Sequence, residues 1–396
     1  SKESANLLLE GMGPLGDTFA RFEAGLINVF GGITGEEVIA TIVRYRRRRK
    51  LFSSAIVSKV LTPSVHRVQA PCSYFGACTG CQWQHIEYTH QLDLKRESVL
   101  REFERFVRLA SVRVPEVLPA PNQFNYRNHA RFTVRREGSV GYVNRITRRF
   151  LPVEHCMLMD PWINQTLGKL QFRSVGMSQI SVRYGVNTGD SLIQPDLEND
   201  DIDIESGQTH YHESLFGNNF RIGSPSFFQV NTVQAEQLIE IVLNRLELTG
   251  HEILVDAFAG VGTFAVLFAK YVKKVIVIEE SESAIKDAKY NLAQSENIEI
   301  RKGKTENVLA GIGFRPDVVI LDPPRSGCQP EVLLSLVRSK PLRLVYVSCD
   351  PATLARDLNV LVEGGFKVEH VDSVDMFPQT YHLECVTTLS SDSSDD

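Results

Sequence analysis

The chain contains 396 residues, of which 43% are hydrophobic and 23% charged, and its formal net charge at pH 7 is −5. This composition is typical of a soluble globular protein, and the length favours two or three domains. No apolar run is long enough to span a membrane, and the N-terminus lacks the pattern of a signal peptide. We therefore expect a cytoplasmic protein whose seven cysteines serve metal binding or catalysis rather than disulfides.

The cations are concentrated in two runs despite the negative net charge. Residues 44–50 hold six cations in seven positions, and residues 125–150 hold seven arginines against one acid, Glu137. Acids cluster instead in residues 196–205 and 392–396. Because phosphate binding depends on local cation density, the two basic runs, with their interleaved Tyr and Phe, favour RNA or DNA binding over a merely solvated surface.

Residues 1–61 predict a small β-barrel. Short strand-like stretches are separated by glycines, and they cover Thr18–Phe22, Glu37–Tyr45 and Ser54–Leu61. A barrel whose surface carries cations and aromatic rings binds oligonucleotides. The alternative is a cap that only aids solubility.

A cysteine motif follows the predicted barrel. Cys72, Cys78 and Cys81 have the spacing C-x5-C-x2-C, and Cys156 is available as a fourth ligand. Such a set holds either tetrahedral zinc or a 4Fe–4S cluster, and the spacing does not decide between them. Cys328 and Cys385 are less suited, because neither lies in a Gly-rich ligand loop.

The middle of the chain changes character twice. Glu87–Leu109 has the apolar periodicity of a long helix, and residues 125–223 have the pattern of strands and turns, with a solvated acidic insertion at 196–205. Beyond Pro225, helices and strands alternate, which predicts an α/β doubly wound sheet. The predicted elements are Val233–Leu246, Glu252–Asp256, Phe264–Tyr271, Lys274–Glu280, Glu282–Ser295, Asp317–Leu321, Pro330–Ser339, Leu344–Val347, Phe366–Val374 and Leu383–Leu389.

A cofactor pocket is predicted at the ends of three of these strands. Asp256-x3-Gly260-x-Gly262 is a Gly-rich turn without the third glycine that a dinucleotide motif requires. Phe258 can pack against a ligand there, Glu279 is placed to accept both ribose hydroxyls, and Asp322 adds a second carboxylate. This layout fits S-adenosylmethionine, whose sulfonium and amino group are cationic.

Cys349 follows the buried strand Leu344–Val347 and precedes a helix that begins after Pro351. Open α/β sheets keep their chemistry on such loops, and a helix N-terminus favours the thiolate, so Cys349 is a candidate nucleophile. The alternative is a free cysteine that fills a gap in the core.

Together these motifs resemble the RNA 5-methyluridine methyltransferase family over nearly the whole chain. The matching segments are Cys72–Cys81 with Cys156, Phe227–Asn231 (FFQVN), Asp256–Phe264, Asp322–Arg325 (DPPR), Ser348–Pro351 (SCDP) and Phe377–Glu384 (FPQTYHLE). The resemblance implies a TRAM barrel in residues 1–61, an iron–sulfur and RNA-binding domain in 62–224, and a class I, Rossmann-like methyltransferase domain in 225–396.

The resemblance also implies roles for individual residues. The cofactor would contact Gln229, Phe258, Gly260, Thr263, Glu279 and Asp322. Cys349 would add to C6 of uracil, and Glu384 would remove the C5 proton after methyl transfer, unless Glu384 only pairs with an arginine. The target base must be flipped out of folded RNA, and Phe227 and Phe228 are candidates for packing near it. A 4Fe–4S cluster would be structural, since no electron moves.

We expect a monomer that acts on 23S rRNA. A tRNA T-loop uridine is the alternative substrate, and a catalytically silent iron–sulfur protein that binds RNA is the alternative from another class. A DNA cytosine methyltransferase shares the thiolate chemistry, but Ser348 stands where its usual Pro-Cys pair would place a proline.

Overall fold

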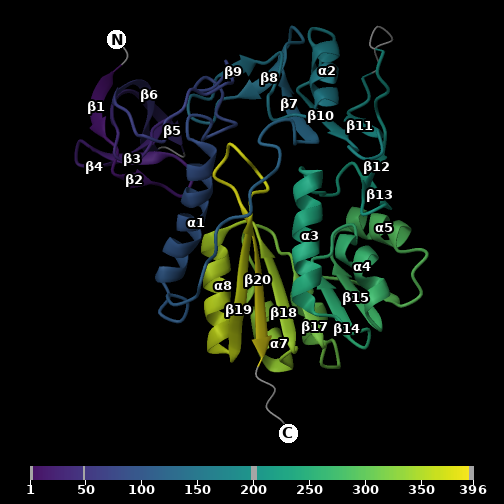
Figure 1. Ribbon diagram of the computed structural model, residues 1–396. Coiled ribbons are helices and arrows are strands. Elements are labelled where there is room, and N and C mark those ends of the chain that lie inside the picture. Colours follow the sequence, from purple (N-terminus) through teal and green to yellow (C-terminus); the bar gives the residue numbers. More distant parts are fainter. Residues whose placement is uncertain (1–2, 48–49, 198–202, 392–396) are drawn as a thin grey trace.

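The computed structural model describes residues 3–47, 50–197 and 203–391. Of the basic run at 44–50, only Arg44 and Tyr45 have described side chains, and the acidic tail at 392–396 lies outside the described residues. Within the described part of the chain, no helix is long and apolar enough to cross a membrane. Figure 1 shows the N-terminal sheet and the central region above a large C-terminal sheet.

The N-terminal sheet closes on itself. Its strand order is β1-β5-β6-β4-β3-β2, and the segment that forms β1 and then β2 pairs first with β5 and then with β3. This closure removes the exposed edges that an open sheet of this size would leave. The strands are β1 (Ser4–Leu8), β2 (Gly11–Met12), β3 (Thr18–Phe22), β4 (Gly25–Phe30), β5 (Glu37–Arg47) and β6 (Lys50–Thr62).

The central region combines a long helix with two small antiparallel sheets. One sheet has the order β11-β10-β7-β8-β9, and β12 pairs with β13 in a hairpin. The elements are α1 (Tyr88–Glu104), β7 (His129–Val134), β8 (Val140–Val143), β9 (Phe150–Pro152), α2 (Pro161–Leu170), β10 (Gln179–Tyr184), β11 (Ser191–Gln194), β12 (His210–Leu215) and β13 (Asn218–Gly223).

The C-terminal sheet has seven strands in the order β16-β15-β14-β17-β18-β20-β19. All its strand pairs are parallel except those made by β20, which is antiparallel to both neighbours. Its strands are β14 (Ile253–Ala257), β15 (Lys274–Glu279), β16 (Ile298–Lys302), β17 (Val318–Leu321), β18 (Arg343–Ser348), β19 (Phe366–Val374) and β20 (Glu384–Ser391).

Helices cover both faces of this sheet because its strands are apolar on both sides. Along β15, Val275 and Val277 face one core, whereas Ile276 and Ile278 face the other. Helices α3, α4 and α5 pack in the first core, and α1, α6, α7 and α8 pack in the second. The helices are α3 (Thr232–Leu246), α4 (Thr263–Phe268, continued by the 3₁₀ turn Ala269–Tyr271), α5 (Glu282–Asn291), α6 (Thr305–Ala310), α7 (Pro330–Ser339) and α8 (Pro351–Glu363).

The structure corrects several predicted elements. α1 ends at Glu104, five residues before the predicted end, and its buried face includes the polar Gln91 and Lys95. α2 lies in a region predicted to be strands and turns; Asp160 caps its N-terminus by accepting a hydrogen bond from Trp162 N. β1, β4, β16 and α6 were not predicted, because each is short and has weak periodicity.

Candidate active site

Parallel pairing brings the predicted site residues to one edge of the C-terminal sheet. β14, β15, β17 and β18 all end at this edge. Glu279 is the last residue of β15, and Phe258, Asp322 and Cys349 directly follow the other three strands. β20 runs the other way, so its first residue, Glu384, lies at the same edge. Ser348 pairs with Cys385, and this register places Cys349 beside Glu384.

Glu279 holds the Gly-rich turn that follows β14. Its Oε2 accepts a hydrogen bond of 2.8 Å from Gly260 N, and its Oε1 accepts bonds of 2.9 and 2.7 Å from the N–H groups of Glu280 and Ser281. Gly260 and Gly262 both have positive φ, as does Phe258 at 62°. The turn therefore brings its backbone close to the space above the sheet edge, where a nucleoside can approach it.

Two carboxyl groups at this edge have raised pKa values: those of the fully buried Asp256 and of the partly buried Asp322. Asp256 accepts a hydrogen bond from Ala265 N at 3.1 Å, while its Oδ1 has no hydrogen-bond partner. Burial raises the pKa of Asp256 to about 8, and the neighbouring Asp322 and Glu279 add to this shift. Burial alone raises the pKa of Asp322 to about 7. A positively charged ligand would relieve both groups.

Cys349 is half-buried at the end of β18. Burial, followed by the nearby Glu384, raises the pKa of its thiol to about 11, and Arg325 opposes the shift. Desolvation is thus the largest influence on the thiol, and the effect of the adjacent helix N-terminus on the thiolate stays a prediction. The side chain of Asp350 accepts the first N–H groups of α8, from Ala352 and Thr353.

Glu384 is 6% exposed. Burial and the nearby Asp322 raise its pKa well above the ordinary value, while Arg325 lowers it. Arg325 also lies 3.3 Å from His382 Nδ1 through its Nη2. Burial and Arg325 lower the pKa of His382 to about 3, so the neutral imidazole accepts this hydrogen bond. Asp322 and Arg325 thus both act electrostatically on Cys349 and on Glu384.

Cys349 opens into a cavity of about 220 Å³ at the junction of all three parts of the chain. The N-terminal sheet contributes residues 12–15, α1 contributes Leu94, Ser98 and Arg101, and the C-terminal sheet contributes residues around Arg325 and His382. Its lining combines apolar side chains with two arginines, Arg101 and Arg325, and two acids, Glu102 and Asp350. This combination of apolar walls and a few polar groups suits a planar polar ligand.

The FFQVN segment lies immediately before α3. The Gln229 carbonyl accepts a hydrogen bond from Asn128 Nδ2 at 3.2 Å, and the Asn231 side chain caps α3. Phe227 is 70% exposed, whereas Phe228 is buried and packs against Phe220 in the core. Phe228 is therefore a core residue and cannot pack on a flipped base, which leaves Phe227 for that role. Thr263 is the first residue of α4, directly after the Gly-rich turn.

The four cysteines predicted to bind a metal converge on a second cavity, of about 290 Å³. Burial raises the pKa of three of their thiols, those of Cys78, Cys81 and Cys156. Arg127 and Arg131 line the same cavity. Among the described residues, no group of His, Cys, Asp or Glu is arranged to hold a single metal ion.

Some residues of the site had no role in the sequence analysis. Arg325 and His382 lie within the DPPR and FPQTYHLE segments, so the motifs pointed to them without indicating what they contact. Lys95 and Asp375 form a fully buried ion pair beside the site. Lys95 lies in a helix with a polar average composition, and nothing in its sequence context marks it as buried.

Comparison with known proteins places this site in a family. Residues 217–392 match the family model described as tRNA (uracil-5-)-methyltransferase. A Listeria innocua protein described as an uncharacterized RNA methyltransferase is 33% identical over 97% of this chain and 96% of its own length. A Synechocystis protein with the same description is 30% identical over 97% of this chain and 95% of its own. The chain therefore belongs to the same family of RNA methyltransferases as these relatives.

The fold of this RNA methyltransferase is also found in a solved structure. The crystal structure of Pyrococcus abyssi tRNA (uracil-54, C5)-methyltransferase in complex with S-adenosyl-L-homocysteine matches with a TM-score of 0.75. The match covers 97% of this chain and 100% of that chain, at 24% sequence identity. The Rossmann-like methyltransferase architecture predicted from the sequence is therefore confirmed.

Proposed function

We propose that this methyltransferase transfers a methyl group from S-adenosylmethionine to C5 of a uridine in RNA. The observation that carries the proposal is the pairing of β18 with β20, which places the Cys349 thiol beside the Glu384 carboxyl. A nucleophile and a base side by side are what substitution at an unactivated pyrimidine carbon requires. Asp322 and Arg325 complete the group.

The cofactor would lie over the carboxyl ends of β14, β15 and β17. Glu279 already orients the Gly260 turn, and its remaining acceptor capacity suits the ribose hydroxyls. The unpartnered Asp256 Oδ1 and the partly buried Asp322 favour the ammonium and sulfonium charges. Phe258, Thr263 and Gln229 border the same edge of the sheet, and we assign them to the cofactor as well.

The chemistry follows from these side chains. The Cys349 thiolate forms a bond to C6, and the C5–C6 π electrons move towards O4 as an enolate. C5 then attacks the methyl carbon, and the methyl–sulfur bond breaks with its electron pair on sulfur. Glu384 accepts the C5 proton, the C5–C6 double bond re-forms, and the thiolate leaves. A buried carboxylate with a raised pKa is a competent base for this last step.

We propose that the four thiols hold a 4Fe–4S cluster. They line one shared cavity of about 290 Å³, which offers room for a cluster held by four thiolates. Arg127 and Arg131 would balance the negative charge of a thiolate-bound cluster. When bound, the cluster would supply cross-links between Cys72, Cys78, Cys81 and Cys156, and no chemistry.

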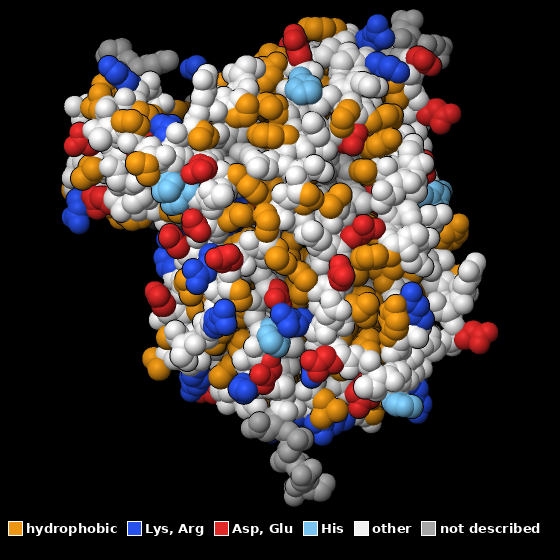
Figure 2. Space-filling view, viewed as in Figure 1, with side chains coloured by type: hydrophobic (Ala, Val, Ile, Leu, Met, Phe, Trp, Pro, Cys, Tyr) orange, Lys and Arg blue, Asp and Glu red, His pale blue; other side chains and the backbone are white. Residues whose placement is uncertain are grey.

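We assign residues 1–61 to a TRAM domain, 62–224 to the iron–sulfur domain and 225–396 to the catalytic domain. The closed N-terminal sheet and its contribution to the Cys349 cavity support an RNA-binding role. Basic and acidic side chains are mixed over the lower half of the face seen in Figure 2. We assign RNA binding to residues 125–150, which hold seven arginines against one acid. We expect a cytoplasmic monomer.

The proposed substrate is 23S rRNA, supported by the TRAM-like barrel and the four-cysteine set. A tRNA T-loop uridine is the second candidate, supported by the family description and by the fold shared with the Pyrococcus abyssi tRNA enzyme.

Methyl-labelled S-adenosylmethionine, incubated with the purified protein and either unmodified 23S rRNA or tRNA, tests the proposal directly. We expect label in 5-methyluridine from the rRNA, and label from the tRNA alone would move the assignment to the second candidate. Label in another nucleoside, or in neither RNA, would contradict the proposed reaction.

A further inference from the structure

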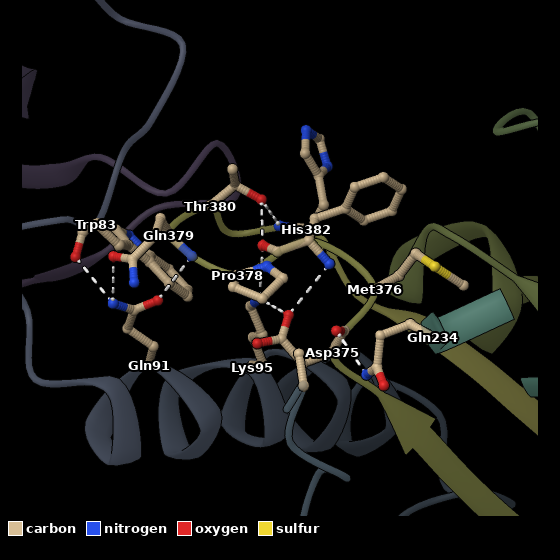
Figure 3. Close-up of polar contacts among 12 residues, drawn as sticks. Trp83, Gln91, Lys95, Gln234, Asp375, Met376, Pro378, Gln379, Thr380 and His382 are labelled. Carbon is tan, nitrogen blue, oxygen red and sulfur yellow. Dashed lines mark hydrogen bonds and ion pairs between the residues drawn. The ribbon is translucent and has the colours of Figure 1, made fainter. Parts of the chain in front are cut away.

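The segment that leads into Glu384 is held by buried polar side chains from two helices. This segment, the β19–β20 loop, covers residues 375–383 and carries His382. Figure 1 shows the loop between α1 and α3, above the sheet. Figure 3 shows Gln91 and Lys95 of α1 and Gln234 of α3 pointing towards it.

The contact at the beginning of the loop is an ion pair. Lys95 Nζ lies 2.5 Å from Asp375 Oδ1, and both side chains are fully buried. Lys95 also donates to the Phe377 carbonyl at 3.1 Å, and the other Asp375 oxygen accepts from the Tyr88 hydroxyl at 2.8 Å. Burying two charged groups costs desolvation energy, and their mutual attraction rarely exceeds this cost. The pair is therefore better explained by a role in positioning the loop than by a gain in folding stability.

The contact in the middle of the loop is a reciprocal pair of glutamines. Gln91 Nε2 donates to Gln379 Oε1, and Gln379 N donates to Gln91 Oε1, both at 3.0 Å. Gln379 has a φ of 69°, in the left-handed region that a non-glycine residue seldom adopts. Trp83 N donates to the Gln379 carbonyl at 3.0 Å. Together these bonds fix a backbone conformation that the loop alone would not favour.

α3 holds the loop from the other side. Gln234 Nε2 donates to the Asp375 carbonyl at 2.8 Å, and Asn231 Nδ2 donates to the Met376 carbonyl at 3.1 Å. The loop is thus hydrogen-bonded to α1 and α3 at once, and Glu384 follows it directly. Directional bonds from two rigid helices fix a side chain more accurately than apolar packing does.

We propose that Gln91, Lys95, Asp375 and Gln379, the anchoring network, are positioning residues that hold Glu384 against the bound uracil when the C5 proton must leave. This inference rests on the proposed function. No hydrogen bond described above joins the network to Cys349 or to the cofactor turn. Its loss should therefore slow the final proton removal more than it slows thiolate addition and methyl transfer.

Gln91→Met is the first test, because methionine keeps the side-chain volume and removes the hydrogen bonds. With S-adenosylmethionine and an RNA containing ordinary uridine, we expect the methylated RNA to remain bonded to Cys349, so that a protein–RNA adduct accumulates on a denaturing gel. A displacement of Glu384 by about 1 Å would slow release of the adduct about 100-fold. Affinity for S-adenosylmethionine should stay unchanged.

Two further variants make the test decisive. Gln379→Met removes the partner side chain and should accumulate the same adduct. Gln171→Met is the matched control, since Gln171 makes three hydrogen bonds to the backbone around β8 and β9, away from the site. Its melting temperature should fall comparably, without any adduct.

Three results would overturn the inference. The first is accumulation of the adduct in the Gln171 variant. The second is release of the RNA from the adduct at an unchanged rate in both network variants. The third is an equal loss of adduct formation and of adduct release in these variants. Failure of the proposed function has a different signature, because the wild-type protein would then form no adduct even with RNA containing 5-fluorouridine.

Discussion

At the scale of single residues, the protein favours the uncharged forms of the two proposed reactive groups, the Cys349 thiol and the Glu384 carboxyl. Burial raises the pKa of Cys349 to about 11 and holds the pKa of Glu384 well above its ordinary value, while Arg325 opposes both shifts. A thiol with such a pKa is a poor nucleophile at pH 7. A cation brought close by the cofactor would lower both pKa values and activate the pair.

Cofactor charge should therefore control the reactivity of Cys349. We expect S-adenosylmethionine to accelerate alkylation of Cys349 by iodoacetamide about tenfold for each unit by which the sulfonium lowers the thiol pKa. S-adenosylhomocysteine, whose thioether sulfur carries no charge, is the matched control. It should shield Cys349 from iodoacetamide and should not accelerate its alkylation. Mass spectrometry of the labelled peptide reports the rate at this cysteine alone. Equal rates with the two ligands would show that the sulfonium does not act on Cys349.

Cofactor binding should also depend on pH through Asp256 and Asp322. Their pKa values of about 8 and about 7 leave both carboxyls largely protonated near pH 6, and a cationic ligand favours their ionised forms. Binding should therefore release protons, and affinity should rise between pH 5.5 and 7, by at most tenfold per unit for each group. Calorimetry in buffers of different ionisation enthalpy counts the protons. Asp322→Asn should reduce the number of protons released on binding. An affinity that does not change with pH would contradict the assignment of these two carboxyls to the cofactor site.

At the scale of elements, strand order decides which residues meet. The alternation of helices and strands after Pro225 predicted that Phe258, Glu279, Asp322 and Cys349 would follow strands of one sheet, since parallel strands share a carboxyl edge. Glu384 is different. Its place beside Cys349 depends on the antiparallel insertion of β20 between β18 and β19, which no local pattern encodes. The resemblance to the family motif predicted the role of Glu384, and the register between β18 and β20 explains why Glu384 lies beside Cys349.

Buried polar residues were the least predictable from the sequence. Gln91 and Lys95 lie on the face of α1 that turns inward, because Asp375 and Gln379, almost 300 residues away, provide their partners. Periodicity assigns a polar residue to the solvent face unless its partner is known. The helix α2 was missed for a related reason, since residues 125–223 are dominated by strand and turn signals.

A short extended segment links the cysteine cavity to the FFQVN segment. The N–H groups of Asn125 and Arg127 each donate at 2.8 Å to carbonyls of the segment after Cys156, and Asn128 N donates at 2.9 Å to the Val230 carbonyl. These backbone hydrogen bonds join the segment after Cys156 to the residues around Gln229. We therefore expect the cysteine site and the proposed cofactor site to be coupled.

If the four cysteines hold the proposed cluster, its removal should weaken cofactor binding. In Cys156→Ser, or after iron is removed by a chelator, we expect a lower melting temperature and a weaker affinity for S-adenosylmethionine, by about 10-fold, as is typical when supporting contacts are lost. Cys328→Ser is the matched control, since Cys328 is buried outside the cluster cavity. Titration calorimetry measures the affinity. Unchanged binding by a folded, iron-free protein would show that the two sites are independent.

At the scale of the whole molecule, the proposed catalytic cavity is lined by several parts of the chain. The N-terminal sheet, α1 and the C-terminal sheet each supply a wall around Cys349, and the Trp83 indole donates to the Gly16 carbonyl at 2.8 Å where they meet. A target base entering this cavity would contact all three parts. The sequence indicated three regions but not their convergence, because contacts between distant segments leave no periodic signal.

Covalent trapping with RNA that contains 5-fluorouridine tests the central claim most directly. A base can remove the C5 hydrogen of uridine as a proton, but it cannot remove a fluorine at that position. The reaction must therefore stop after thiolate addition and methyl transfer, with the RNA still bonded to the protein. We expect the purified protein with S-adenosylmethionine to form a denaturation-resistant complex with a 23S rRNA fragment, and Cys349→Ala to form none. A protein that binds the cofactor yet traps neither rRNA nor tRNA, or a Cys349→Ala variant that still traps, would contradict the account.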